Sequence, residues 1–193
     1  MTGSRALVLR LSLGALVLGA LALHASHKLE RGVFAEMLWA CHVASLLLGL
    51  GLVTRVVWLV ALGTVFHLAA GLPAYVLDVI ALQQTTLTSV VVHLAPPLSG
   101  LFFLKQEAPW PRFVPVATVA LYPVLILVSR LVTEPALNVN LAFSPWPPLA
   151  GVAPWVWFSW LLNLVVLTAA VPVVDRWLRR ALHPATEAKL AHG

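Results

Sequence analysis

The only cysteine of the chain, Cys41, directly precedes His42 in an apolar stretch. A second histidine, His93, stands in the run Val-Val-Val-His-Leu-Ala-Pro-Pro at 90–97, where nothing else is polar. Cysteine attacks esters and thioesters as its thiolate, and a neighbouring imidazole is a recognised base for making that thiolate. If the fold brings the two side chains together, Cys41 and His93 can act as nucleophile and base.

Other polar residues in or beside apolar segments are candidates for supporting this pair. Ionisable groups inside a bilayer are costly, so their presence indicates a function. The supporting candidates are His42, His67, Asp78, Asn138, Asn140 and Asn163. Each also has a purely structural interpretation. A histidine or an asparagine can join two membrane helices through a hydrogen bond, and an acidic residue near the membrane surface can extend its carboxylate into water.

The elements that must position these residues are apolar segments long enough to cross a membrane. A membrane span needs about 20 mostly apolar residues at 1.5 Å each. Six segments qualify, and they cover residues 9–27, 34–53, 56–82, 86–104, 113–132 and 154–174. Gly71 and Pro73 are expected to interrupt the third segment, and internal prolines are expected to kink the fourth and fifth. The pattern predicts an all-α, polytopic membrane protein built as a bundle of six transmembrane helices.

The composition supports the same class. Hydrophobic residues make up 61% of the 193 residues and charged residues 10%, against roughly 45–50% and about 25% in soluble domains. These values exclude a soluble globular protein, a disordered chain and a coiled coil. The net charge of +5 does not indicate nucleic-acid binding, because the 12 Lys and Arg are scattered singly between apolar runs. One cysteine allows no intrachain disulfide and no Cys/His zinc spacing, so we expect no metal site.

The distribution of cationic residues predicts the orientation. Six spans put both termini on one side, which carries nine of the 12 Lys and Arg, whereas the other side carries three. Cytoplasmic loops are enriched in these residues, so both termini are expected to be cytoplasmic. We therefore expect one six-helix domain over residues 1–176 and a short basic cytoplasmic tail over 177–193, suited to anionic headgroups. The expected location is a bacterial cytoplasmic membrane.

Four of the candidate side chains are expected to lie at the same depth in the membrane. Counted at 1.5 Å per residue, Cys41, His93 and Asn163 lie roughly 10–14 Å below the outer boundary of their spans. His67, counted from the inner side, reaches about 16 Å and hence the same layer. We expect all four side chains to point into the bundle in the outer half of the bilayer.

Three kinds of chemistry fit this layer. In the first, His93 activates the thiol of Cys41, and Asp78, His67 or Asn163 orients the base. In the second, two of the histidines are axial ligands of a b-type haem, although the i, i+14 spacing typical of two-haem cytochromes is absent. In the third, the layer is structural, and the protein is an assembly subunit of a larger membrane complex.

Three short motifs carry a resemblance to a known family. They are Leu-Trp-Ala-Cys-His at 38–42, His93 in a later apolar helix, and the stretch 137–151 with Pro-Trp-Val-Trp at 154–157. In this order they resemble bacterial integral membrane proteins related to the eukaryotic transmembrane phospholipid acyltransferases. A more distant likeness is to the androgen-induced-gene type of intramembrane hydrolases. The resemblance covers residues 34–172.

This resemblance implies a role for several residues. It implies Cys41 as the nucleophile on a lipid ester, His93 as its base, and Asn138 and Asn140 as parts of an outer-loop element. The chain departs from the family pattern in three places. His42 follows the cysteine instead of preceding it, an Asn-Val-Asn sequence at 138–140 replaces the usual Asn-Tyr pair, and Asp78 lacks the surrounding Thr-Pro-Asp pattern.

The sequence thus favours an intramembrane acyl-lipid enzyme, a hydrolase or an acyltransferase, with Cys41 and His93 at its centre. The alternative is a non-enzymatic subunit that binds haem, quinone or another apolar cofactor. The expected partners are membrane lipids and other membrane proteins. We expect no nucleic-acid partner, and for the enzyme no cofactor, with haem b belonging only to the alternative.

Overall fold

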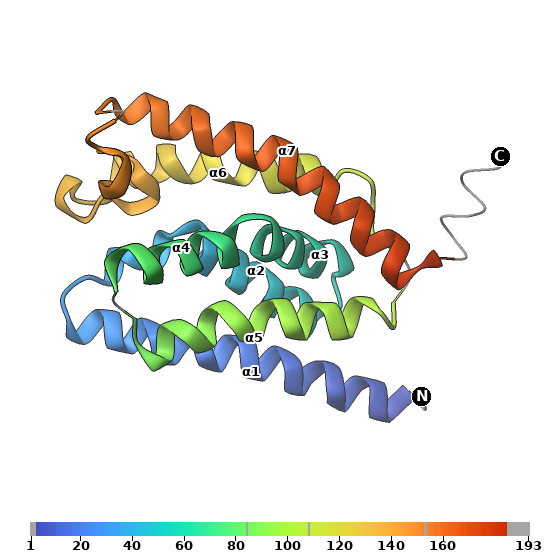
Figure 1. Cartoon of the computed structure of the whole chain (residues 1–193). Coiled ribbons are helices and arrows are strands. Elements are labelled where there is room, and N and C mark those ends of the chain that lie inside the picture. The colour runs from blue at the N-terminus through green and yellow to red at the C-terminus, as the bar shows by residue number, and fades with distance from the viewer. Residues whose placement is uncertain (1–2, 84, 108, 153, 185–193) are drawn as a thin grey trace.

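The computed structural model describes residues 3–83, 85–107, 109–152 and 154–184, and it confirms the all-helical class. Helices make up 83% of the described residues, which contain no strand (Figure 1). The α-helices are α1 (Gly3–Glu30), α2 (Ala40–Thr54), α3 (Val57–Phe66), α4 (Leu72–Leu82), α5 (Leu87–Leu104), α6 (Val114–Val132) and α7 (Val156–Leu182). Short 3-10 turns, η1 (Phe34–Leu38), η3 (Pro135–Leu137), η4 (Val139–Leu141) and η5 (Pro147–Leu149), lie in the connections.

Five of the helical segments are long and apolar enough to cross a membrane. They are Ser4–Glu30, Val57–Leu82, Leu87–Leu104, Val114–Val132 and Val156–Leu182, whereas α2 is shorter. Large apolar side chains such as Val116, Leu131 and Ile80 stand more than two thirds exposed on the outside of the bundle. An apolar exterior of this kind suits hydrocarbon and not water, so the fold is that of an integral membrane protein.

The helices run back and forth along one bundle. α1 packs against α2 and α5, α2 packs against α3, and α6 lies beside α7. The N-terminal start of α1 and the C-terminal end of α7 lie at the same end of the bundle (Figure 1). The start of α2, the connection between α4 and α5, and the loop between α6 and α7 gather at the opposite end. This opposite end is the one that holds Cys41.

The third apolar segment is continuous, which corrects the interruption expected at Gly71 and Pro73. A π-helical turn, η2 (His67–Gly71), joins α3 to α4, and the amide of Leu72 donates to the carbonyl of His67, five residues earlier. Proline lacks an N–H, and its ring clashes with the carbonyl four residues before it. The wider π turn directly before Pro73 accommodates this clash without ending the helix. Such π turns occur frequently at functional sites.

The second segment differs from the continuous helix expected over 34–53. The 3-10 turn η1 is followed by Trp39, whose extended backbone (ψ 137°) separates it from α2. The helix therefore begins at Ala40 and has 15 residues. As a result, Cys41 lies in the first turn of a helix and not one third of the way along one.

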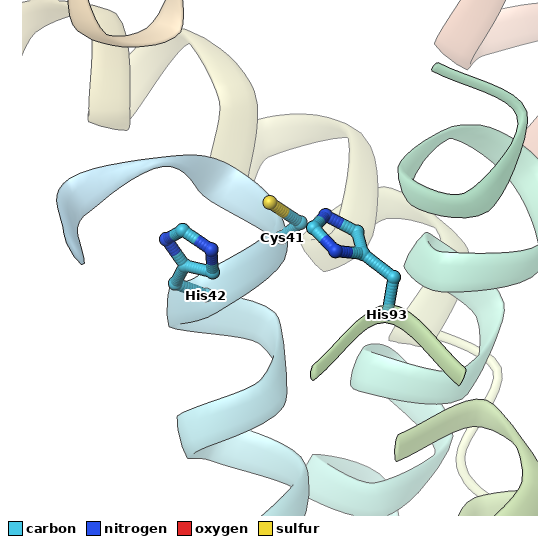
Figure 2. A group of neighbouring side chains, drawn as sticks. All are labelled: Cys41, His42 and His93. Atoms are coloured by element: carbon cyan, nitrogen blue, oxygen red, sulfur yellow. The ribbon is translucent and has the colours of Figure 1, made fainter. Parts of the chain in front are cut away.

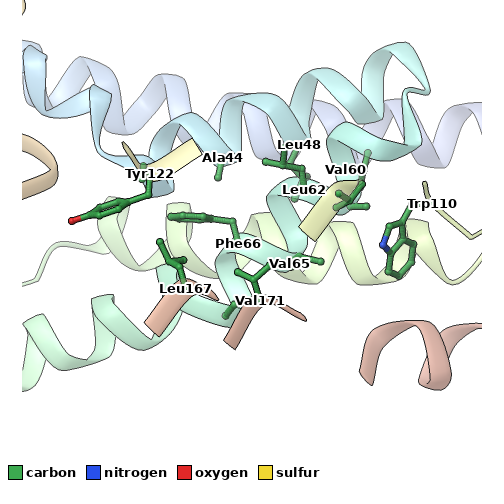
Figure 3. Packing of buried hydrophobic residues seen from close by; sticks show 14 of the residues in the cluster. Ala44, Leu48, Val60, Leu62, Val65, Phe66, Trp110, Tyr122, Leu167 and Val171 are labelled. Atoms are coloured by element: carbon green, nitrogen blue, oxygen red, sulfur yellow. The ribbon is translucent and has the colours of Figure 1, made fainter. Parts of the chain in front are cut away.

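The inner part of the bundle is tightly packed around α3, which contacts α2, α5, α6 and α7. Figure 3 shows buried side chains that include Ala44, Leu48, Val60, Leu62, Val65, Phe66, Trp110, Tyr122, Leu167 and Val171. Gly63 and Gly100 permit the close approach of the helices. A Cβ on Gly63 would lie 2.6 Å from the carbonyl oxygen of Ala44, and one on Gly100 would overlap the hydroxyl of Thr64. Small residues at such contacts are typical of membrane helix packing.

The last helix extends beyond the boundary expected at residue 176. α7 continues to Leu182, so the start of the expected tail belongs to the bundle, and residues 185–193 of that tail lie outside the described residues. Arg179, which was expected at headgroup level, is buried. Arg176 and Arg180 are exposed.

Arg179 is buried because it has a full set of acceptors. Its Nε donates to the Asp175 carboxylate at 2.8 Å, and its terminal nitrogens donate to the carbonyls of Trp110 and Pro111 at 2.8 and 3.1 Å. The indole of Trp110 donates to the second oxygen of Asp175 at 2.7 Å. This network attaches the connection between α5 and α6 to α7, and it explains why the helix remains ordered past residue 176.

Candidate functional site

Cys41 lies in the first turn of α2, directly beside two histidines. One ligand-type atom from each of Cys41, His42 and His93 lies within 4.8 Å of the other two. Figure 2 shows the ring of His93 reaching the cysteine from α5, with His42 on the other side. Cys41 is half-buried, while both histidines are buried. The structure therefore brings together the pair that the sequence singled out, and adds His42 to it.

Hydrogen bonds to backbone carbonyls fix the orientation of both imidazoles. Nδ1 of His93 lies 2.8 Å from the carbonyl oxygen of Ser89, and Nδ1 of His42 lies 3.0 Å from that of Glu36. A carbonyl only accepts, so in each neutral ring the proton is on Nδ1 and the lone pair is on Nε2. Tyr75 stacks on His93 with ring centroids 4.1 Å apart, which restrains the ring further.

Asn140 holds the start of α2 in place from a distant part of the chain. Its side-chain oxygen accepts from the amide of Ala40 at 2.8 Å, and its side-chain nitrogen donates to the carbonyl of Leu38 at 2.8 Å and to Ser129 Oγ at 2.9 Å. The residue is 1% exposed and has a left-handed backbone (φ 56°). Asparagine tolerates this conformation better than most residues. The loop between α6 and α7 thus supplies the N-terminal cap next to Cys41.

His67 supports α2 from the π turn. Its Nε2 lies 2.9 Å from Ser45 Oγ, and the Ser45 hydroxyl donates to the carbonyl of Cys41 at 2.9 Å. His67 is completely buried, and its ring centroid lies 6.5 Å from that of His93. A Cβ on Gly71 would lie 3.0 Å from His67 Nδ1, so glycine leaves the room that the ring occupies. His67 positions the cysteine helix and does not touch the thiol.

No protein-family model, curated protein or solved structure matches this chain. Its chemistry must therefore be read from its own side chains. The side chains around the start of α2 include a thiol and two imidazoles, each with a free lone pair. They lie together beside the N-terminus of this helix. A thiol beside an unprotonated imidazole can exchange a proton and then act as a nucleophile. The same groups can bind a soft or borderline metal ion.

Three of the predicted supporting residues lie apart from this cluster. Asn163 donates to the hydroxyl of Tyr122 at 2.8 Å between α7 and α6, so it does not belong to the cluster. Asp78 accepts from the indole of Trp146 at 2.7 Å and fastens the loop between α6 and α7 to α4. Asn138 bonds within the loop, where its oxygen accepts from the amides of 143 and 144. None of the three orients His93.

Two features of the site are missing from the sequence-based prediction. His24 of α1 is buried, lies with its ring centroid 4.9 Å from that of His42, and has its Nδ1 3.1 Å from Thr88 Oγ1. Its position close to the end of the first span was the available signal, because it matches the depth of the other histidines. The second feature is a group of side chains that could hold a metal ion, which the spacing in the sequence does not reveal. Ligand residues on different helices leave no characteristic spacing in the sequence, yet Cys41, His42 and His93 converge.

Proposed function

We propose that this protein is an intramembrane acyl-lipid enzyme that uses Cys41 as nucleophile and His93 as general base. The observation that carries the proposal is the convergence of the thiol with a ring nitrogen of His93 inside a buried cluster. Because Nδ1 of His93 is bonded to the Ser89 carbonyl, Nε2 is the atom that accepts the thiol proton. The arrangement is the nucleophile–base–orienting-group pattern of covalent catalysis, with a backbone carbonyl as the orienting group.

The reaction follows from these roles. His93 Nε2 takes the proton of the Cys41 thiol, and the thiolate attacks the carbonyl carbon of a lipid ester to form a C–S bond. The ester C–O bond then breaks, and the imidazolium returns the proton to the departing alcohol. Water or the hydroxyl of a second lipid attacks the thioester, His93 takes its proton, and the sulfur leaves and is reprotonated. Water gives a hydrolase, and a lipid hydroxyl gives an acyltransferase.

The first turn of α2 supplies stabilisation for the negative charge that develops. The amide of Ala40 is used by Asn140 and that of His42 by the carbonyl of Trp39, so the amide of Cys41 is the donor that we assign to the oxyanion. Amides of this kind, close to the nucleophile, stabilise the oxyanion of acyl transfer. The positive end of the helix dipole also favours negative charge within the first turn. Cys41 is thus both the nucleophile and the source of an oxyanion donor.

A lipid substrate has a suitable surface between α6 and α7. A groove of about 440 Å³ runs between these helices, and Tyr122, Ile126, Leu164 and Arg130 are among the residues that line it. Arg130 forms no ion pair with any described residue, and guanidinium groups bind phosphate well. The Tyr122 hydroxyl donates to the carbonyl of Asn140 at 3.4 Å, which connects the groove to the cap of α2. An acyl chain in the groove with its phosphate at Arg130 is the binding mode we propose.

The orientation in the membrane is part of the proposal. We infer that the chain crosses the bilayer six times, with α2 and its preceding 3-10 turn as the shortest crossing, and that both termini are cytoplasmic. Nine of the 12 Lys and Arg then lie on the cytoplasmic side. Cys41 lies in the outer half of the bilayer, and the membrane is a bacterial cytoplasmic membrane.

Turnover of lipid esters by purified protein tests this function. The wild-type protein in lipid nanodiscs should release a fluorescent fatty acid from a labelled phospholipid, or transfer it to an added lysophospholipid. Cys41→Ala should abolish the reaction, and His93→Ala should slow it by roughly 10²–10⁴-fold, the range for loss of a general base. His183→Ala, at the opposite end of the bundle, is the matched control and should match the wild type. A folded wild-type protein without activity would overturn the proposal in favour of a non-enzymatic subunit.

A further inference from the structure

His42 is not needed for the proposed acyl chemistry, yet its ring is aimed at the reacting groups. Its Nδ1 is bonded to the Glu36 carbonyl, and its Nε2 is buried without any hydrogen-bond partner among the described residues. Figure 2 shows the Nε2 side of this ring turned toward Cys41 and His93. Leaving a buried acceptor without a donor is unfavourable. The lone pair of His42 therefore lacks the partner that its position requires.

A metal ion is one group that can supply that partner. One nitrogen of each imidazole and one sulfur converge, and the Nδ1–H of each ring donates to a backbone carbonyl, which leaves Nε2 with the free lone pair. This is the usual arrangement of metal-bound histidines, whose second ring nitrogen is held by a carbonyl or a carboxylate. Thiolate and imidazole are the ligands that Zn²⁺ and related ions prefer. One thiol and two histidines match the Cys–His–His composition of such sites.

We propose that Cys41, His42 and His93 bind one divalent cation of the Zn²⁺ class, and that this ion holds the cysteine in an unreactive form. On binding, the thiol loses its proton to water and a metal–sulfur bond forms, while each imidazole donates its Nε2 lone pair without changing protonation. The bound thiolate is then unavailable for attack on an ester. The inhibitory role rests on the proposed function, whereas the metal site itself does not.

The geometry requires only a small movement. Tetrahedral zinc with bonds of about 2.0–2.3 Å places its ligand atoms roughly 3.3–3.6 Å apart, compared with at most 4.8 Å here. Cys41 and His42 are adjacent on α2, so the main adjustment is a rotation of His93 toward them. Three protein ligands leave a fourth position for water or a lipid oxygen. His24, whose ring lies 4.9 Å from that of His42, is the next imidazole beside the three proposed ligands.

Cobalt spectroscopy on the detergent-solubilised full-length protein tests the site. Co²⁺ is titrated into metal-stripped protein, and Zn²⁺ is then added in competition. The wild type should bind one Co²⁺ with the visible bands of a four-coordinate site and a thiolate charge-transfer band, and Zn²⁺ should abolish both. Cys41→Ser should remove the charge-transfer band, and His42→Ala should weaken binding by more than about tenfold. His183→Ala should bind like the wild type.

Parallel labelling of Cys41 with an acyl-thioester probe separates this inference from the proposed function. Zn²⁺ should block labelling of the wild type, and removal of the ion should restore it. Cobalt binding without any acylation by lipid donors would refute the proposed enzyme function but would still support the metal site. Acylation of Cys41 that is unchanged at saturating Zn²⁺ would refute the inference but would remain consistent with the proposed enzyme function. A folded wild type without a thiolate–cobalt band, or unaltered binding by His42→Ala, would also overturn it.

Discussion

Replacement of Asn140 by alanine should destabilise the protein and loosen the start of α2. The change removes three buried hydrogen bonds, to Ala40, Leu38 and Ser129. A bond contributes about 1 kcal/mol, and a buried partner left unpaired adds to the loss, so these bonds account for about 3–4 kcal/mol. Alanine in the left-handed conformation of this residue adds about 1 kcal/mol. The expected total is about 4–5 kcal/mol.

Thermal unfolding followed with a thiol-reactive dye measures this effect, because Cys41 is the only cysteine. For a chain of this size the loss corresponds to a melting temperature lowered by about 10–15 °C. Cys41 should also react faster with maleimide at low temperature, since its helix turn loses the cap. Asn163→Ala is the matched control, because it removes one half-buried bond to Tyr122 and should lower the melting temperature by about 2–4 °C. Equal shifts for the two variants would refute the capping role of Asn140.

Further predictions concern the π turn, the buried ion pair and the topology. Gly71→Ala should displace the ring of His67 and cost about 1–3 kcal/mol in thermal unfolding, so an unchanged or raised melting temperature would contradict the tight contact. Arg179→Gln should cost about 3–5 kcal/mol because it leaves a buried carboxylate without its cation, whereas Arg176→Gln, at an exposed position, should change stability by less than about 0.5 kcal/mol. A reporter fused to the C-terminus should be cytoplasmic and an insertion within residues 144–151 extracytoplasmic. The reverse result would invert the orientation.

Much of the helical architecture was predictable, because a membrane span is marked in the sequence by a continuous run of about 20 mostly apolar residues. The starts of α5 and α6 lie within one residue of their predicted positions, and their ends coincide with them. The juxtaposition of Cys41 and His93 was also predictable, since costly polar groups at equal depth tend to face one another in a bundle.

Features that depend on contacts between distant segments were not predictable. The break at Trp39 depends on a cap from Asn140, which lies 100 residues away from Ala40 along the chain. The continuation of α7 past residue 176 depends on acceptors for Arg179 from the connection between α5 and α6. The role of Asn163 was misjudged for a related reason. Depth places a residue along its helix, but helix rotation decides its partners.

The central claim is that the sulfur of Cys41 carries an acyl group during turnover. The most direct measurement is the mass of the Cys41-containing peptide after the protein, in lipid nanodiscs, is mixed with a phospholipid donor and quenched in acid. The account predicts an added acyl mass on Cys41 that hydroxylamine removes and that is absent from His93→Ala. An unmodified Cys41 during measurable lipid turnover, or an acyl group on any other residue, would contradict the account.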